Sequence, residues 1–367
     1  MPFKVRYSYL PEQFADVDDV FDALKRLVPT GDFTLGKPVA EFEERFADLI
    51  GTKHAIGVGS GTDALKLPLK ALGIGFGDEV ITAANTFIST VGAINETGAR
   101  PILVDCDDSF CMDVGQVEAA ITEHTKAIMP VHLTGDVTDM TALMAIAEKH
   151  GLSVVEDACQ GILSETDGKR SGTWGVAAGF SLHPLKNLNV WGDAGVIVTD
   201  DDAINEKLCL IRNHGLKNRD EIAFLGCNSR LDSVQAVVGN WLIGRTHDIT
   251  NRRIENAAYY DEAFGGISGI TVPRRRRNVK NVYHLYMVFA ENRDALYGHS
   301  LENGVEAKVH YPIPLYQQEG LKPLGYSPGD FPVTDRHAKT VISFPVDQHI
   351  TREQQEIVID TVRSFYA

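Results

Sequence analysis

Short apolar runs alternate with amphipathic helical segments over the first two-thirds of the chain, and this alternation limits the fold more than any other feature. The strand-like runs are residues 54–59, 79–84, 101–106, 126–133 and 152–158, and the helix-like segments between them are 61–73, 87–97, 113–122 and 138–150. Strands joined by helices indicate βαβ units and a mainly parallel sheet. The runs are apolar at successive positions, as expected when both faces of a sheet are covered.

The pattern changes after about residue 240. A polar helix near 245–264 is followed by a strand over 283–290, and the remaining expected elements are a helix at 293–303, a strand at 305–310 and a helix at 351–365. We therefore predict an α/β protein with a large domain, residues 1–245, and a smaller α+β domain, residues 246–367.

Charge and composition limit the partners. The net charge of −15 disfavours nucleic acid and anionic membranes. Residues 1–14 lack the features of a secretory signal, and no apolar run reaches the ~18 residues that span a bilayer. The odd number of cysteines favours free thiols in the cytoplasm over disulfides: Cys106, Cys111, Cys159, Cys209 and Cys227.

A glycine-rich turn, GVGSGTDAL (57–65), connects an expected strand to an expected helix. Backbone N–H groups at the start of a helix can bind an anion, and glycine lets a phosphate approach closely. The turn matches neither the P-loop nor the dinucleotide fingerprint. A tight turn in which Ser60 or Thr62 caps the helix is the alternative interpretation.

Two further segments carry reactive groups. VVEDACQG (154–161) places Asp157 at the end of a buried strand, where ligands of parallel sheets bind, although Asp157 could instead cap a helix. GFSLHPLKN (179–187) places Lys186 on a short connection between two expected strands. A desolvated lysine can form a Schiff base with a carbonyl, whereas most lysines lie on the surface.

An anion site, an aspartate at a strand end and a lysine 29 residues later are together what pyridoxal phosphate requires. His132 also follows a strand and could contact substrate or cofactor, or be structural. Arg274 to Arg277 could be a solvated loop or a phosphate clamp. No metal-ligand spacing and no G-x-S-x-G nucleophile elbow is present, so we expect neither a metal site nor a serine hydrolase.

Several motifs resemble the DegT/DnrJ/EryC/StrS sugar aminotransferases, which are fold-type I pyridoxal-phosphate enzymes. The matching motifs are SGTDAL (60–65), PVHLTGDVTDM (130–140), EDACQ (156–160), FSLHPLKN (180–187), GDAG (192–195), CNSRLDSVQA (227–236) and VHYPIPLYQ (309–317). The resemblance covers nearly the whole chain and implies a mainly parallel sheet of the seven-stranded type, as in aspartate aminotransferase.

The resemblance also implies a role for individual residues. Lys186 matches the Schiff-base lysine, and Asp157 matches the partner of the pyridine nitrogen. The other implied cofactor contacts are Gly61, Thr62 and Ser181 at the phosphate, Phe87 stacked on the ring, Gln160 at the ring hydroxyl and Asn228 reaching the phosphate from a second subunit. The match of Asn228 implies a homodimer whose active sites lie at the subunit interface.

The resemblance implies transfer of an amino group from L-glutamate to a keto-sugar, which we expect to be nucleotide-linked, with pyridoxamine phosphate as the intermediate form of the cofactor. Leu182, His183 and Ala194 depart from the usual pattern. We expect His183, His310 and Tyr311 to contact the acceptor, with packing of the small domain as the alternative role of the last two. Other possible functions are a sugar dehydratase, a cyclitol or aminobenzoate-type aminotransferase, and a non-catalytic cofactor-binding regulator. Lys186 argues against the dehydratase branch, which has histidine at that position.

Overall fold

The computed structural model describes residues 3–367 and contains a seven-stranded sheet in the order β1-β9-β8-β5-β4-β2-β3. Its strands are β1 (His54–Val58), β2 (Glu79–Ala83), β3 (Arg100–Val104), β4 (Thr125–Met129), β5 (Ser153–Asp157), β8 (Ala177–Ser181) and β9 (Gly195–Thr199). Only β9 runs antiparallel to its neighbours; the other adjacent pairs are parallel. The predicted mainly parallel α/β sheet is therefore confirmed.

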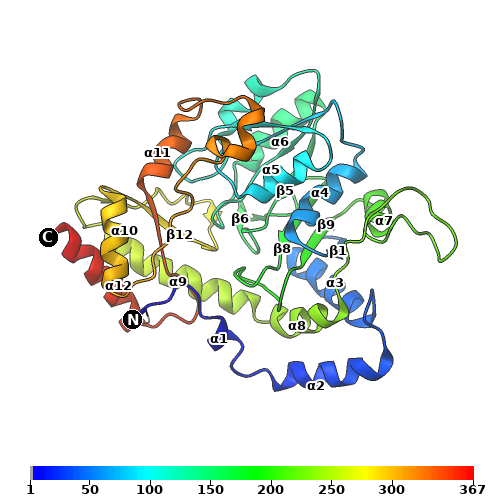
Figure 1. Cartoon of the computed structure of the whole chain (residues 1–367), viewed down its shortest axis with the longest axis horizontal. Coiled ribbons are helices and arrows are strands. Elements are labelled where there is room, and N and C mark those ends of the chain that lie inside the picture. The colour runs from blue at the N-terminus through cyan, green and yellow to red at the C-terminus, as the bar shows by residue number, and fades with distance from the viewer. Residues whose placement is uncertain (1–2) are drawn as a thin grey trace.

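Helices cover both faces of this sheet, as Figure 1 shows. The helices and 3₁₀ turns up to residue 243 are α1 (Leu10–Gln13), α2 (Asp18–Leu27), η1 (Val28–Thr30), α3 (Lys37–Ile50), α4 (Gly61–Ala71), α5 (Ile88–Asn95), η2 (Val114–Gln116), η3 (Glu118–Ala120), α6 (Met140–His150), α7 (Asp202–Ile211) and α8 (Ser233–Ile243). Val196 and Val198 of β9 share a core with α3 and α8, whereas Ile197 packs with α4 and α7. This alternation along one strand explains why the run is apolar at every position.

The C-terminal part forms a second core. Its elements are α9 (Thr246–Phe264), β10 (Ile270–Thr271), β11 (Val279–Lys280), β12 (Tyr286–Ala290), α10 (Arg293–Glu302), η4 (Leu315–Gln317), η5 (Glu319–Leu324), α11 (Pro332–Thr340), β13 (Val341–Phe344) and α12 (Arg352–Tyr366). Strands β10, β12 and β13 make a three-stranded sheet, and β11 pairs with the hairpin of β6 (Glu165–Thr166) and β7 (Lys169–Arg170).

The N-terminal segment packs with this C-terminal core. Val5 pairs with Val305, and Val5 and Tyr9 are buried among residues of α9, β12 and α12. Figure 1 places the start of the described chain beside α12. The division of the chain into two domains, residues 1–245 and 246–367, stays a prediction. Residues 1 and 2 lie outside the part of the chain that the structure describes. The packing of Val5 supports assigning the first residues to the smaller unit.

Two predicted elements are wrong. Residues 113–122 form the turns η2 and η3 rather than one helix, because Asp113 caps the first turn by accepting from the Gly115 N–H at 3.0 Å, and a glycine within the first turn disfavours propagation. Residues 305–310 form bridges at Val305 and Lys308 but no continuous strand. Over residues 3–367, no helix is both long and apolar enough to cross a membrane.

Candidate active site

A cavity of about 410 Å³ lies at the carboxyl ends of the central strands. The predicted site residues that line it are Gly61, Thr62, Phe87, Asp157, Gln160, Ser181, His183, Lys186, His310 and Tyr311. They come from segments as far apart as α4 and the chain before η4, so the fold brings together groups separated by 250 residues (61 to 311). Ligands of parallel sheets bind at this edge because the loops after the strands converge there.

Lys186 lies on the short connection between β8 and β9, as predicted. Its backbone N–H donates to the carbonyl of His183 at 2.8 Å, and its carbonyl accepts from Asn189 Nδ2 at 2.7 Å. These bonds fix the start of the side chain, which lines the cavity. Desolvation lowers the pKa of the Lys186 ammonium, although the negative charge of Asp157 opposes the shift. A larger fraction of the amine is therefore unprotonated and nucleophilic near neutral pH.

Asp157 is the last residue of β5 and is 5% exposed. One carboxylate oxygen accepts from Thr90 Oγ1 at 2.7 Å, and the other accepts from the backbone N–H of Cys159 at 3.1 Å. Thr90 is in turn within 2.6 Å of the Thr86 hydroxyl. The carboxylate is thus oriented by its neighbours and faces the cavity, where it can hold a proton on a ligand's ring nitrogen.

The start of α4 forms a confined polar pocket. Ser60 caps the helix by accepting from the Asp63 N–H, and Gly61 is the first helical residue. A Cβ atom on Gly61 would lie 2.6 Å from the Ser181 Cβ, so only glycine fits beside that serine. The hydroxyl of Thr62 donates to Ser89 Oγ at 3.1 Å. Free N–H groups and hydroxyls at the start of a helix suit a phosphate.

Replacing Gly61 by alanine should weaken pyridoxal-phosphate binding about 10-fold or more, since losing one charge-assisted hydrogen bond costs roughly 1.5–3 kcal/mol. The added methyl group must push Ser181 or the helix start away. Equilibrium dialysis of the cofactor measures the effect. Gly92→Ala is the matched control because a Cβ on Gly92, in α5, meets no atom within 4 Å. Equal affinities in the two variants would contradict the assignment.

The remaining predicted residues surround this centre. The side chain of Phe87 is 51% exposed, and its ring lies 6.3 Å from that of Tyr311. Gln160 Oε1 is buried without a hydrogen-bond partner among residues 3–367. His310 Nδ1 lies 2.8 Å from Ser343 Oγ, and burial lowers its pKa to about 4. Exposed His183 lines the same cavity, so its ring can meet an entering substrate.

Three sequence candidates lie outside the cavity: Asn228, the arginine run and His132. Asn228 pairs with Asn213 on the segment between α7 and α8, which projects from the body in Figure 1. In the arginine run, Arg275 makes a bidentate ion pair with Asp261, and Arg276 pairs with Asp136. Two of the four arginines are therefore held by carboxylates within the chain, which argues against the phosphate-clamp interpretation.

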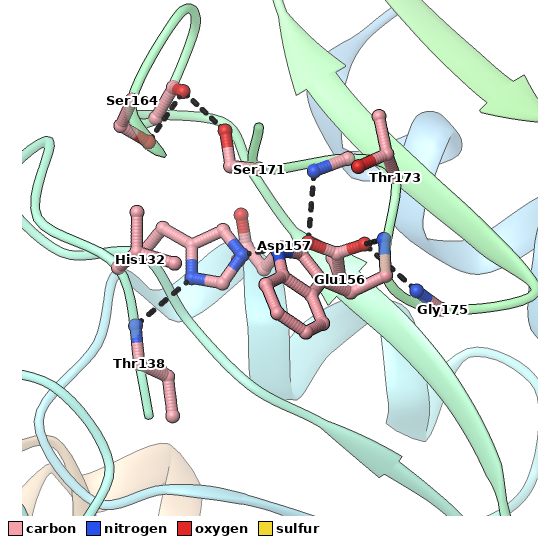
Figure 2. Close-up of polar contacts among 12 residues, drawn as sticks. His132, Thr138, Glu156, Asp157, Ser164, Ser171, Thr173 and Gly175 are labelled. Carbon is pink, nitrogen blue, oxygen red and sulfur yellow. Dashed lines mark hydrogen bonds and ion pairs between the residues drawn. The ribbon is translucent and has the colours of Figure 1, made fainter. Parts of the chain in front are cut away.

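His132 does not contact the cavity and instead belongs to a buried network behind it. Figure 2 shows its ring between Thr138 and Glu156. His132 Nε2 lies 2.9 Å from Glu156 Oε2, and both side chains are fully buried. Glu156 also accepts three backbone N–H groups of the loop before β8, those of Gly172, Trp174 and Gly175, at 2.8–2.9 Å. The network supports the structural interpretation of His132.

Replacing Glu156 by alanine should lower the free energy of unfolding by about 3–5 kcal/mol, because breaking a buried pair leaves its partners unsatisfied. Three backbone donors and the imidazole would lose their acceptor. Thermal unfolding followed by circular dichroism measures the change. Glu148→Ala, at an exposed position of α6, should stay within about 0.5 kcal/mol of the wild type. An unchanged melting temperature for Glu156→Ala would contradict the structural role.

The residues of the cavity wall that the sequence analysis did not predict include three with polar side chains: Ser89, Thr90 and His284. Ser89 and Thr90 lie in the first turn of α5, where the motif NTFIST places hydroxyls directly after Phe87. That signal was available from the sequence. His284 lies before β12, more than 90 residues after Lys186 in sequence, and no local pattern connects the two.

Comparison with known proteins identifies the class. A family model described as "DegT/DnrJ/EryC1/StrS aminotransferase family" matches residues 15–363, and the chain belongs to this family. It is 40% identical to a Geobacillus stearothermophilus "Pleiotropic regulatory protein", over 97% of both chains. It is 38% identical to the "dTDP-3-amino-3,4,6-trideoxy-alpha-D-glucose transaminase" of Streptomyces venezuelae, covering 94% of this chain and 91% of the relative.

Comparison with solved structures supports the same family assignment. The structure of S. venezuelae DesV "in complex with ketimine intermediate" has a TM-score of 0.97 and 36% identity, covering 100% of this chain and 99% of that one. The structure of NtdA from Bacillus subtilis "with bound cofactor pmp" has a TM-score of 0.92 and 30% identity, covering 99% and 85%. The chain is therefore an aminotransferase that uses pyridoxal phosphate. Its confined helix start, unpartnered Gln160 oxygen, acidic Asp157 and desolvated Lys186 fit this cofactor.

Proposed function

We propose that this enzyme transfers the amino group of L-glutamate to a nucleotide-linked keto-sugar. The observation that carries the proposal is the convergence of Lys186, Asp157 and the start of α4 on one cavity. Relatives named as transaminases of dTDP-linked and UDP-linked amino sugars support a nucleotide sugar as the acceptor, and they leave the nucleotide, sugar and ring carbon open.

The bound cofactor supplies an aldehyde that holds the amino group and a ring that takes up electron density. We assign the phosphate to the pocket made by Gly61, Thr62 and Ser181. Asp157 keeps a proton on the ring nitrogen, and its bonds to Thr90 and Cys159 hold it in that orientation. Lys186 Nζ removes a proton from one carbon and returns it to another.

The other site residues have supporting roles in this proposal. Gln160 binds the ring hydroxyl, which would satisfy its unpartnered buried oxygen. The exposed ring of Phe87 stacks on the cofactor ring, and His183, His310 and Tyr311 contact the acceptor. His310 acts as a neutral imidazole, since its pKa of about 4 leaves it uncharged at neutral pH.

We further propose a homodimer in the cytoplasm, with Asn228 of each chain completing the partner's site. Leu225, which is 96% exposed, and Ile222, which is 63% exposed, lie on the same projecting segment as Asn228. Large apolar side chains that are exposed together are typical of a surface covered by a partner. Sedimentation equilibrium tests the dimer, and a monomer that retains full activity would contradict it.

A product assay tests the proposed reaction. Purified enzyme is incubated with L-glutamate and panels of dTDP-linked and UDP-linked keto-sugars, and products are followed by mass spectrometry. We expect equal amounts of 2-oxoglutarate and an amino sugar. Loss of water from the sugar without amine transfer would support a dehydratase instead, and the absence of turnover with every pair would support a regulatory role.

A further inference from the structure

A small cavity of about 10 Å³ lies beside Lys186. Lys186, Gln160 and His284 line both this small cavity and the active-site cavity of about 410 Å³, whereas Asn187 lines only the small one. Protein cavities that hold a single water molecule have a volume on the order of 10–15 Å³. The small cavity therefore has room for one water molecule and for nothing larger.

Three side chains of its wall carry buried atoms that lack a hydrogen-bond partner among residues 3–367. These atoms are Gln160 Oε1, Asn187 Oδ1 and His284 Nδ1. The other amide atom of Asn187 is engaged, since Nδ2 donates to the carbonyl of Val282 at 3.2 Å. Buried polar groups of proteins are nearly always paired, either with a protein group or with an ordered water. Three unpaired atoms in the wall of one cavity therefore indicate a shared polar ligand.

The remaining polar side chains of the wall, those of Cys159 and Ser181, already have partners. Cys159 Sγ donates to the carbonyl of Gly179 at 3.6 Å. Ser181 Oγ accepts from the backbone N–H of His183 at 3.3 Å. The unused hydrogen-bonding capacity of the small cavity thus belongs to two amide oxygens, one imidazole nitrogen and the amine of Lys186.

The charges around the small cavity favour an uncharged ligand. Burial lowers the pKa of the His284 imidazole well below its ordinary value, and the positive charges of Lys186 and Arg253 lower it further. His284 is therefore neutral, with a proton on only one of its two ring nitrogens. The same positive charges disfavour a bound cation, and among residues 3–367 no carboxylate lines the cavity to offset them.

We propose that the small cavity binds one water molecule, which joins Gln160, Asn187 and His284 and fixes the tautomer of His284. The two amide oxygens can only accept hydrogen bonds, so they take both hydrogens of the water. His284 Nδ1 must then donate to the water oxygen. The single proton of the neutral ring therefore lies on Nδ1, and Nε2 is an acceptor. Gln160 Oε1 has two lone pairs, so it can also accept from the ring hydroxyl of the cofactor.

The tautomer matters because His284 also lines the active-site cavity. An unprotonated Nε2 accepts hydrogen bonds and cannot donate them. We expect His284 to accept from an N–H or O–H group in that cavity, such as the amine of Lys186, rather than to bind an anionic group of a substrate. The water site does not depend on which sugar accepts the amino group.

A high-resolution crystal structure of the enzyme saturated with pyridoxal phosphate tests the site. We expect one ordered water within about 3.2 Å of Gln160 Oε1, Asn187 Oδ1 and His284 Nδ1. No ordered water in the small cavity of the wild type would overturn the proposal. This measurement requires no variant, so the site can be tested even if substitutions in its wall prevent folding.

Asn187→Leu removes one acceptor while keeping a side chain of similar size, and its structure should lack the water. Asn256→Leu is the matched control and should retain it. Asn256 is also buried, its Nδ2 donates to the carbonyl of Asp347 at 2.9 Å, and it lines neither cavity. A water that stays in place in a folded Asn187→Leu enzyme would contradict the role of Asn187 in binding it.

Nitrogen NMR of the holoenzyme with isotope-labelled histidines measures the tautomer, and the signal missing from His284→Gln identifies His284. We expect the proton on Nδ1 in the wild type and in Asn256→Leu. A proton on Nε2 of His284 in the wild type would overturn the proposed arrangement, because Nδ1 could not then donate to the water.

Discussion

Replacing Lys186 by alanine should lower the rate of amino transfer by about 10³-fold or more, since positioned proton transfer contributes roughly 10²–10⁴. The side chain lines the cavity beside Asp157, and its lowered pKa makes the free amine available. Alanine supplies neither the nucleophile nor the proton carrier. The measurement is the initial rate of 2-oxoglutarate formation from L-glutamate in the presence of the sugar acceptor.

The control for this experiment is Lys25→Ala. The Lys25 side chain is 76% exposed on α2, far in sequence from the site, and its ion pair with Asp22 is a surface contact. Its rate should equal that of the wild type. Circular dichroism should show that both variants are folded. A folded Lys186→Ala enzyme with more than about a tenth of the wild-type rate would contradict the role of Lys186.

Replacing Asp157 by asparagine should lower the rate by about 100-fold, the scale of losing a charge-assisted hydrogen bond in a buried site. The substitution keeps the shape of a side chain that accepts from Thr90 and Cys159. It removes the negative charge that favours a protonated ring nitrogen. The cofactor ring then takes up electron density less readily.

The pH dependence of the Asp157→Asn rate is a second test of the role of Asp157. A nearby anion raises the pKa of a ring nitrogen, so its removal lowers that pKa and reduces the protonated fraction at neutral pH. The residual activity of Asp157→Asn should therefore rise, relative to the wild type, as the pH is lowered. Asp200→Asn, at an exposed position after β9, is the control and should keep the wild-type profile. A wild-type rate in Asp157→Asn would contradict the proposed role.

Much of the large unit could be predicted from local patterns. The strands β1 to β5 and the helix α4 could be recognised in the sequence from their apolar residues and the turns between them. The structure places each element within a few residues of its predicted bounds. Asp157 ends β5, and Lys186 lies on the connection between β8 and β9, so their positions relative to the expected strands made both candidates for a site at the sheet edge.

What could not be predicted depends on contacts between distant segments. His284 and Arg253 reach the neighbourhood of Lys186 only because the C-terminal part packs over the sheet edge. His132 was ambiguous because a strand-end histidine can face either a ligand or a buried carboxylate, and its partner Glu156 lies 24 residues away. The predicted strand at 305–310 was wrong because an alternating apolar and polar segment can bridge single residues without forming a ladder.

We propose that Lys186 carries the cofactor, and chemical trapping of the modified lysine is the direct test. The purified enzyme, saturated with pyridoxal phosphate, is reduced with borohydride, digested and analysed by peptide mass spectrometry. We expect a single phosphopyridoxyl group, on the peptide that contains Lys186, and none on Lys186→Ala. Attachment to a different lysine, or a protein that retains no cofactor after reduction, would contradict this role of Lys186.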